Sequence, residues 1–410
     1  MPYIQRAITP ILKQRVSTSK CMLLVGARQV GKSTLIKHEF KDFNRANFDD
    51  RLTRMQAKEE PKLFLLNNPQ PLFIDEVQKE SSILEDIKQI VDESDERGMF
   101  LLSGSQKLEL MKGKSESLAG RVSISELTGL SMREIYGVKF NRHFIPTDAY
   151  IKEREKEIVK YDNIWEIIHK GSYPELYDID RDWQEYYSSY VATYLERDIN
   201  ELVAADGITF TKFLTAVAAR TGELLNYSNI AGDVGVSEPT IKNWISILER
   251  TGIVYLLQPY SASALKRAIK TPKLYFRDTG LACYLTRWLT ADTLKCSAVA
   301  GNMFETFVVS EILKSYSNEG KDYRFNIFYY RGKDRNASGE NEIDLVIEED
   351  GVLYPVEIKM SGNPKASMGA TNQVLDKVSD KKRGLGVILC LIDKKTYLRE
   401  NLVALPIEFI

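Results

Sequence analysis

The sequence predicts an α/β protein made of several successive domains. Three observations support this fold class: strand-length apolar runs alternate with helical segments in the first third of the chain, helical patterns fill the middle, and a strand hairpin lies near the C-terminus. A chain of 410 residues is long enough for about two to four domains that each bury a core. We expect four parts, at residues 1–140, 141–208, 209–290 and 291–410.

The first part is predicted to form a parallel sheet with helices on both faces. Its apolar runs are residues 21–25, 46–48, 72–74, 100–102 and 122–124, and helical segments such as 83–95 lie between them. This alternation is typical of sheets that bind a ligand at the carboxyl ends of their strands.

A phosphate-binding loop follows the first of these runs. Residues 26–33 read Gly-Ala-Arg-Gln-Val-Gly-Lys-Ser, and a helical segment follows them. The glycines allow backbone N–H groups and the helix N-terminus to surround a phosphate chain. Lys32 is expected to contact the β and γ phosphates, and the Ser33 hydroxyl to contact Mg²⁺. The predicted nucleotide-binding residues are Gly26, Ala27, Arg28, Gln29, Val30, Gly31, Lys32, Ser33 and Thr34.

Carboxylates and hydroxyls that could support hydrolysis follow two other runs. Asp75 is predicted to bind Mg²⁺ together with Ser33, and Glu76 to polarise the attacking water. Ser103 or Ser105 is suited to sensing the γ phosphate, although a strand that ends in an ordinary Gly-Ser turn is the alternative interpretation.

Arg121 is a candidate contact to the γ phosphate, because an arginine there would offset the charge that develops during phosphoryl transfer. It could act within its own chain or from a neighbouring copy in a homo-oligomer. An ordinary surface arginine is the alternative.

These segments together resemble a known family, the predicted prokaryotic AAA+ ATPases that carry a C-terminal domain of unknown function. The resemblance lies in residues 26–33, 73–78, 102–106, 117–121, 171–175 and 194–199, and so covers nearly the whole chain. It implies ATP as the nucleotide and Mg²⁺ as the cofactor. The sequence contains no Asn-Lys-x-Asp motif of the kind that reads guanine.

Composition narrows the remaining classes of function. The formal charge of −1 creates no global field for nucleic acid, so any such contact must come from a local basic surface. Apolar runs such as 387–392 have strand length and are too short to span a bilayer, so we expect no membrane contact. Four scattered cysteines without CxxC spacing favour a reducing cytoplasm and argue against a zinc ribbon or a disulfide framework. Three histidines that lie far apart argue against a histidine-based metal site or a Ser/His/Asp triad.

The third part predicts a winged helix-turn-helix. A helix at 227–234 ends before Gly235, and a second helix, capped by Ser237, would bury Ile241, Trp244, Ile245 and Leu248 on one face. Extended segments at 253–257 and 273–276 enclose a basic wing that contains Lys266, Arg267 and Lys270. The outward face of the second helix has few base-reading side chains. Binding of DNA and docking of a protein therefore both stay open.

The fourth part contains a strand hairpin that carries acidic residues. Asp350 and Gly351 form the predicted turn, so that paired residue numbers sum to 701 and Asp344 faces Glu357. Lys359 would lie on the same face, opposite Glu342. Like charges facing each other across a strand pair require a neutralising partner, and a divalent cation could supply it.

This spacing of Asp, Glu and Lys resembles the restriction-endonuclease-like nuclease superfamily. In that superfamily a glutamate from the preceding helix often completes the metal site, and Glu305 matches its position. The resemblance implies Glu305, Asp344 and Glu357 as metal ligands and Glu357 and Lys359 as catalytic groups in phosphodiester hydrolysis. A solvated hairpin face and a retained fold without catalysis are the alternatives.

Two functions follow from these predictions. In the first, a Mg²⁺-dependent ATPase controls a winged-helix and nuclease-like module that acts on nucleic acid. In the second, ATP binding and slow hydrolysis act as a regulatory switch, and the C-terminal domain is an inactive scaffold that binds a protein partner. The C-terminal carboxylates discriminate between the two.

Overall fold

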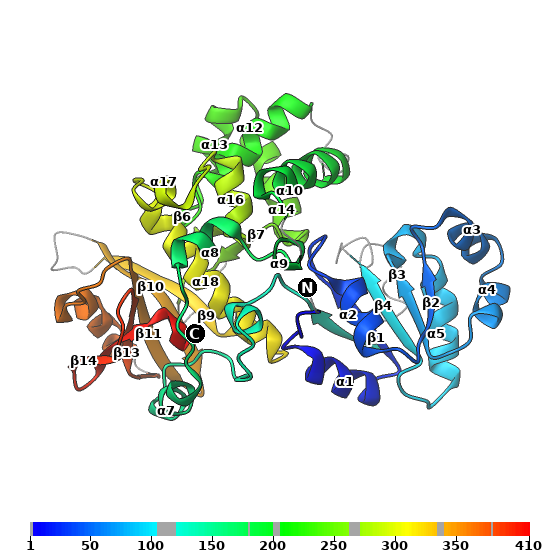
Figure 1. Ribbon diagram of the computed structural model, residues 1–410, viewed down its shortest axis with the longest axis horizontal. Coiled ribbons are helices and arrows are strands. Elements are labelled where there is room, and N and C mark those ends of the chain that lie inside the picture. Colours follow the sequence, from blue (N-terminus) through cyan, green and yellow to red (C-terminus); the bar gives the residue numbers. More distant parts are fainter. Residues whose placement is uncertain are drawn as a thin grey trace.

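The computed structural model describes residues 3–104, 120–178, 181–199, 206–261, 271–333, 340–378 and 380–410. Ser105 and the predicted wing residues Lys266, Arg267 and Lys270 lie outside these ranges. The described chain contains three sheets (Figure 1). One sheet lies at each end of the long axis, and a group of helices with a small third sheet lies between and above them.

The first sheet has five parallel strands in the order β2-β3-β4-β1-β5. All five predicted strands are present, and the predicted parallel sheet is confirmed. The strands are β1 (Cys21–Val25), β2 (Asn44–Asn47), β3 (Leu72–Asp75), β4 (Phe100–Gly104) and β5 (Val122–Glu126). The surrounding helices are α1 (Thr9–Thr18), α2 (Lys32–Glu39), α3 (Arg51–Glu59), α4 (Pro61–Asn67) and α5 (Ile83–Glu93).

Strand β1 is buried on both faces, which explains its unbroken apolar sequence. The side chains of Cys21, Leu23 and Val25 pack in a core that includes Ile87 of α5. Leu24 faces the other way, into a core that extends through the rest of the molecule.

The segment after the first sheet is helical and rich in tyrosine. It contains α6 (Met132–Ile135), α7 (Asp148–Arg154), α8 (Ile164–Lys170), α9 (Glu175–Asp178), α10 (Trp183–Tyr190) and a π-helix at Val191–Ile199. Five rings of this segment are buried in the same large core: Tyr173, Tyr186, Tyr187, Tyr190 and Tyr194.

The middle module, defined as residues 206–261 and 271–276, has three helices and a three-stranded sheet in the order β6-β8-β7. Its elements are α12 (Gly207–Ala218), β6 (Glu223–Leu224), α13 (Tyr227–Val234), α14 (Glu238–Arg250), β7 (Val254–Leu257) and β8 (Lys273–Phe276). The two predicted helices are present. Ser237 caps α14, and the four predicted apolar residues of that helix are buried.

The C-terminal region begins with α16 (Thr279–Leu285), α17 (Ala291–Lys295) and the long helix α18 (Ala300–Asn318). A mixed sheet follows, in the order β14-β15-β13-β11-β10-β9, with β12 beside β11. Its strands are β9 (Ile327–Lys333), β10 (Glu340–Glu349), β11 (Val352–Lys359), β12 (Lys382–Arg383), β13 (Gly386–Cys390), β14 (Thr396–Arg399) and β15 (Leu402–Pro406). Helix α18 packs against β11 and β8.

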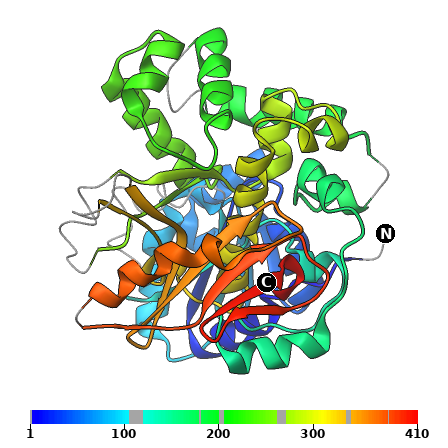
Figure 2. The same ribbon diagram turned by 90° about the vertical axis from the view of Figure 1, so that its left-hand side faces the viewer.

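The predicted register of the β10–β11 hairpin is confirmed where the two strands pair. The pairs run from Glu349 and Val352 to Leu345 and Val356, and each sums to 701. Figure 2 shows this C-terminal sheet in front of the first sheet. Across the described ranges, no helix combines the length and hydropathy needed to cross a membrane.

Candidate nucleotide site and C-terminal carboxylate cluster

The loop between β1 and α2 has the backbone geometry of a phosphate-binding loop. Gly31 precedes α2 with a φ of 93°, in the left-handed region that favours glycine. A Cβ at Gly26 would lie 2.2 Å from the carbonyl oxygen of Leu127, so only glycine fits. The N-terminus of α2 therefore opens directly onto the loop.

Lys32 is a buried cation at the centre of this loop. Its ammonium group donates to the carbonyl oxygens of Gly26 and Ala27, both at 2.9 Å. Burial lowers the pKa of Lys32 to about 8, against the opposing effect of the Glu76 and Asp75 carboxylates. A buried ammonium whose hydrogen-bond partners are neutral carbonyls fits the binding of an anion.

The two predicted carboxylates lie where β3 ends. Asp75 is buried and accepts a hydrogen bond from the hydroxyl of Ser103 on β4. Glu76 has a φ of 54°, a strained conformation for a residue with a side chain, and its carboxylate accepts from the amide of Gln78. Ser103 thus orients Asp75, a role that the sequence did not indicate.

A cavity of about 490 Å³ contains the loop and its partners. Lys32, Ser33, Thr34 and Glu76 line it, as do Pro174 and Glu175 of the predicted family segment. The rings of Tyr3 and His38 stack at a centroid distance of 4.1 Å on its wall. The structure therefore brings the predicted loop, the Glu76 carboxylate and residues of the helical segment into one space.

Arg6 also supports the loop, and sequence reasoning missed it. Its guanidinium is 3% exposed and donates to the carbonyl of Val30 at 2.8 Å, to Glu134 at 3.0 Å and to Thr128 at 2.7 Å. No local pattern marks Arg6, because these partners lie 24 to 128 residues away in the chain.

The tyrosine-rich helices contact loop residues that lie between Gly26 and Gly31. The hydroxyl of Tyr186 donates to the side-chain oxygen of Gln29 at 2.8 Å, and the Arg28 guanidinium lies 5.6 Å from the ring centroid of Tyr194. The helical segment is therefore in direct contact with the phosphate-binding loop.

The prediction that Arg121 contacts the γ phosphate of its own chain is wrong. In β5, Val122 lies beside Cys21 at the start of β1, whereas the loop leaves the other end of β1, where Val25 lies beside Glu126. Four residues of strand place Arg121 about 13 Å or more from the loop edge. Its guanidinium pairs instead with Asp92. A role in a neighbouring copy stays a prediction.

The C-terminal hairpin brings Asp344, Glu357 and Lys359 together. The strand pairing stops at Leu345, and the Asp344 carboxylate accepts instead from the backbone N–H of Ile358 at 2.7 Å. The Lys359 ammonium lies 2.8 Å from both Asp344 and Glu357. Glu342, predicted to lie opposite Lys359, is beyond the paired part of the hairpin and forms an ion pair with Lys273 at 2.6 Å.

Glu305 of α18 lies next to the same cluster. It accepts from the hydroxyl of Tyr275 at 2.6 Å and from Lys273 at 3.2 Å. Burial raises the pKa of Glu305, and the negative charge of Asp344 raises it further. Sequence reasoning missed both Lys273 and Tyr275, which belong to β8 of the middle module.

The cluster only partly fits a metal ion. One oxygen of Glu357 is buried without a hydrogen-bond partner, which suits a cation. Burial and the Asp344 charge raise the pKa of Glu357 to about 8. However, no three acidic, histidine or cysteine side chains of the described ranges are grouped so that they could hold a metal ion. Lysine ammonium groups contact these carboxylates instead.

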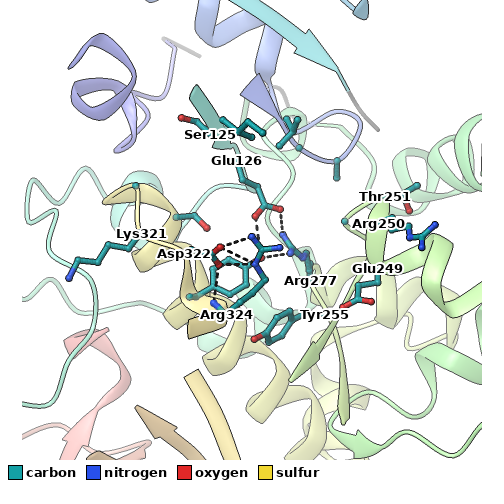
Figure 3. A pocket seen from close by; sticks show the side chains of 18 of the residues that line it. Ser125, Glu126, Glu249, Arg250, Thr251, Tyr255, Arg277, Lys321, Asp322 and Arg324 are labelled. Atoms are coloured by element: carbon teal, nitrogen blue, oxygen red, sulfur yellow. Dashed lines mark hydrogen bonds and ion pairs between the residues drawn. The ribbon is translucent and has the colours of Figure 1, made fainter. Parts of the chain in front are cut away.

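A second cavity, of about 580 Å³, lies between the first sheet, the middle module and the end of α18 (Figure 3). Gly26 and Ala27 of the phosphate-binding loop line it, together with Thr251 and Gly252 after α14. Figure 3 shows the Arg277 guanidinium beside Glu126 in this cavity. The guanidinium donates to the Glu126 carboxylate, and the two atoms are 2.6 Å apart. The cavity is therefore lined by the first sheet and its loop, by the middle module, and by the end of α18 with the residues that follow it.

Comparison with known proteins defines the class of the first region. Residues 18–136 match the family model described as an AAA domain. This region is therefore an AAA-type domain, which agrees with its parallel sheet and phosphate-binding loop. Residues 161–292 and 300–410 match two models described as domains of unknown function, DUF8612 and DUF4143.

Relatives of similar overall extent occur in mycobacteria. The chain is 27% identical over 375 residues to uncharacterized proteins of Mycobacterium tuberculosis and Mycobacterium bovis, which covers 89% of this chain and 76% of each relative. Among solved structures, a RuvB variant of Thermotoga maritima matches 60% of this chain and 85% of its own, with 16% identity and a TM-score of 0.26. A chain of Drosophila ORC bound to DNA matches 68% and 85%, with 10% identity and a TM-score of 0.21.

Proposed function

We propose that this protein is a Mg²⁺-dependent ATPase whose nucleotide state controls the middle module and the C-terminal region. One observation carries the proposal: a single cavity contains Lys32, Ser33 and Glu76. Asp75 is near enough for its charge to oppose the lowering of the Lys32 pKa by burial. The match of residues 18–136 to an AAA domain supports the same activity.

Each residue then has a defined role. Lys32 leaves the carbonyls of Gly26 and Ala27 and donates to phosphate oxygens, where its burial strengthens the attraction. Ser33 and Asp75 would hold Mg²⁺, which supplies positive charge next to the phosphates when bound. Glu76 orients and polarises the attacking water, and Ser103 keeps Asp75 in position.

Two substitutions test the ATPase activity. Lys32→Ala should abolish ATP binding, whereas Glu76→Gln should retain binding and lose at least about 100-fold in turnover. Calorimetry measures the first effect, and phosphate release measures the second. Lys37→Ala is a matched control, because Lys37 lies on the same helix with an exposed side chain. Unchanged turnover in Glu76→Gln would remove its assigned role.

The middle module is proposed to be a winged helix. The order α12-β6-α13-α14-β7-β8, in which the three strands form a small antiparallel sheet, supports this assignment, with α14 in the position of the second helix of a helix-turn-helix. Gly252 of this module lines the same cavity as Ala27 of the phosphate-binding loop, which gives the nucleotide state a route to this module. We propose nucleic acid as its ligand, and a protein partner is the alternative.

A second candidate function concerns the C-terminal cluster. We propose a nuclease-like metal site at Asp344, Glu357 and Glu305, supported by the buried oxygen of Glu357 that has no hydrogen-bond partner. A regulatory switch with an inactive C-terminal region is the competing function. Metal-dependent cleavage of DNA or RNA that disappears in Glu357→Ala separates the two.

A further inference from the structure

Lys273 enters the C-terminal carboxylate cluster from a different part of the molecule. It is the first residue of β8 in the middle module, and its side chain is 5% exposed. Its ammonium lies 2.6 Å from Glu342 and 3.2 Å from Glu305. Neither carboxylate belongs to the middle module, so Lys273 joins the two regions through charge.

The energetic balance at Lys273 favours the charged form. Burial alone would lower the pKa of Lys273, but the carboxylates of Glu305, Asp344 and Glu342 outweigh burial and raise it. Lys359 provides a second ammonium, which contacts Asp344 and Glu357. Two lysines therefore neutralise part of the charge of four carboxylates, and Lys273 and Tyr275 both donate to the same oxygen of Glu305, Oε1.

Strand β8 also connects this cluster to the nucleotide-binding region. Arg277 follows directly after β8, and its guanidinium pairs with Glu126 at the end of β5, in the cavity that Gly26 and Ala27 line (Figure 3). All four residues of β8 are buried. A shift of β5 or of the loop can therefore act on Lys273 through one short, packed strand.

We propose that Lys273 is an internal counter-cation that excludes a divalent metal from the C-terminal cluster, and that displacement of β8 opens the cluster to that metal. The inference rests on the second candidate function and is independent of ATP hydrolysis. It accounts for two pairs of carboxylates that each share one lysine and yet do not form a metal-binding group in this conformation.

Binding of Mn²⁺ alone to the full chain tests the proposal, with free Mn²⁺ measured by electron paramagnetic resonance and no nucleotide present. Lys273→Met should bind one Mn²⁺ more than the parent chain, with an affinity at least about tenfold higher. Lys273→Arg keeps the charge and should not gain this site. Adding Glu357→Gln to Lys273→Met should remove it. Equal Mn²⁺ binding by the parent and by Lys273→Met would overturn the proposal.

Thermal stability provides a second measurement, because Lys273→Met leaves two partly buried carboxylates without their lysine. The variant should melt at a lower temperature than the parent, and Mn²⁺ should raise its melting temperature more than that of the parent. A destabilised variant that Mn²⁺ does not rescue would contradict the proposal. If Lys273→Met binds Mn²⁺ without cleaving DNA or RNA, the nuclease function fails and the role of Lys273 stands.

Discussion

Two buried lysines in this protein have pKa values shifted in opposite directions, and the difference follows from their partners. Lys32 has two carbonyl oxygens as hydrogen-bond partners, and burial lowers its pKa to about 8. Lys273 is in contact with two carboxylates, and its pKa is raised. Lys32 could be predicted from sequence because its loop is a local pattern. Lys273 could not, because its partners lie 32 or more residues away and only folding brings them together.

His169 gives a prediction about pH. Its ring stacks on Trp183 at 4.2 Å, and its Nε2 contacts the carbonyl oxygen of Trp288 at 2.8 Å. Burial lowers the pKa of His169 below 6.5, so the unfolded chain binds more protons than the folded chain between that lowered pKa and 6.5. Stability should therefore fall as the pH drops below 6.5, by at most about 1.4 kcal/mol per pH unit from this group.

This effect is measured from the melting temperatures of the parent and of His169→Gln between about pH 7.5 and about pH 5.5. This range brackets the ordinary histidine pKa of about 6.5. The parent should lose more stability on acidification than the variant does. Parallel curves would contradict the assignment.

At the scale of single elements, the β10–β11 hairpin was predictable because its register is set by its turn. Asp350 and Gly351 both have positive φ, 52° and 75°, as a two-residue turn of this type requires. The ladder that follows matches the predicted numbering as far as Leu345. Beyond that point the Asp344 carboxylate accepts a hydrogen bond from the backbone N–H of Ile358, and strand alternation does not predict this bond.

Replacement of Gly351 by alanine tests how much this turn contributes. No atom lies within 4 Å of a Cβ built at Gly351, so the cost is backbone strain alone, about 1–2 kcal/mol. Gly232→Ala is the matched control: it has equal space but lies inside helix α13, where alanine should stabilise by about 0.5–1 kcal/mol. The melting temperature should fall in Gly351→Ala and rise in Gly232→Ala. If both melting temperatures shift in the same direction, turn geometry is not the cause.

At the scale of the whole molecule, the regions share a core, and this limits what sequence patterns could show. Leu24 of the first sheet, Leu274 of the middle module and Val356 of the second sheet belong to one apolar cluster. Each region's secondary structure could be predicted, since periodicity is local. The contacts that join the regions, such as Tyr186 with Gln29, connect residues 157 positions apart and follow only from the packed arrangement.

Arg277 is the residue on which communication between these regions is expected to depend. It pairs with Glu126 of β5, contacts the hydroxyl of Tyr323 after α18, and accepts at its backbone carbonyl from Ser310 at 2.8 Å. Arg277→Gln should destabilise the chain by about 2 kcal/mol, because Glu126 loses a charged partner in a partly enclosed site. Arg383→Gln is the control, since Arg383 pairs with Asp376 within the C-terminal region, outside this cavity.

Hydrogen exchange separates a loss of stability from a loss of communication. In a Glu76→Gln background, ATP should alter the exchange of the backbone amides of β8, because β8 is tied through Arg277 to the strand beside the phosphate-binding loop. With Arg277→Gln added, the effect of ATP should stay within the first sheet and its helices, while ATP binding itself is retained. Exchange in β8 that still responds to ATP in this double variant would place the connection elsewhere, at the contacts of Arg28 and Gln29 with the tyrosine-rich helices.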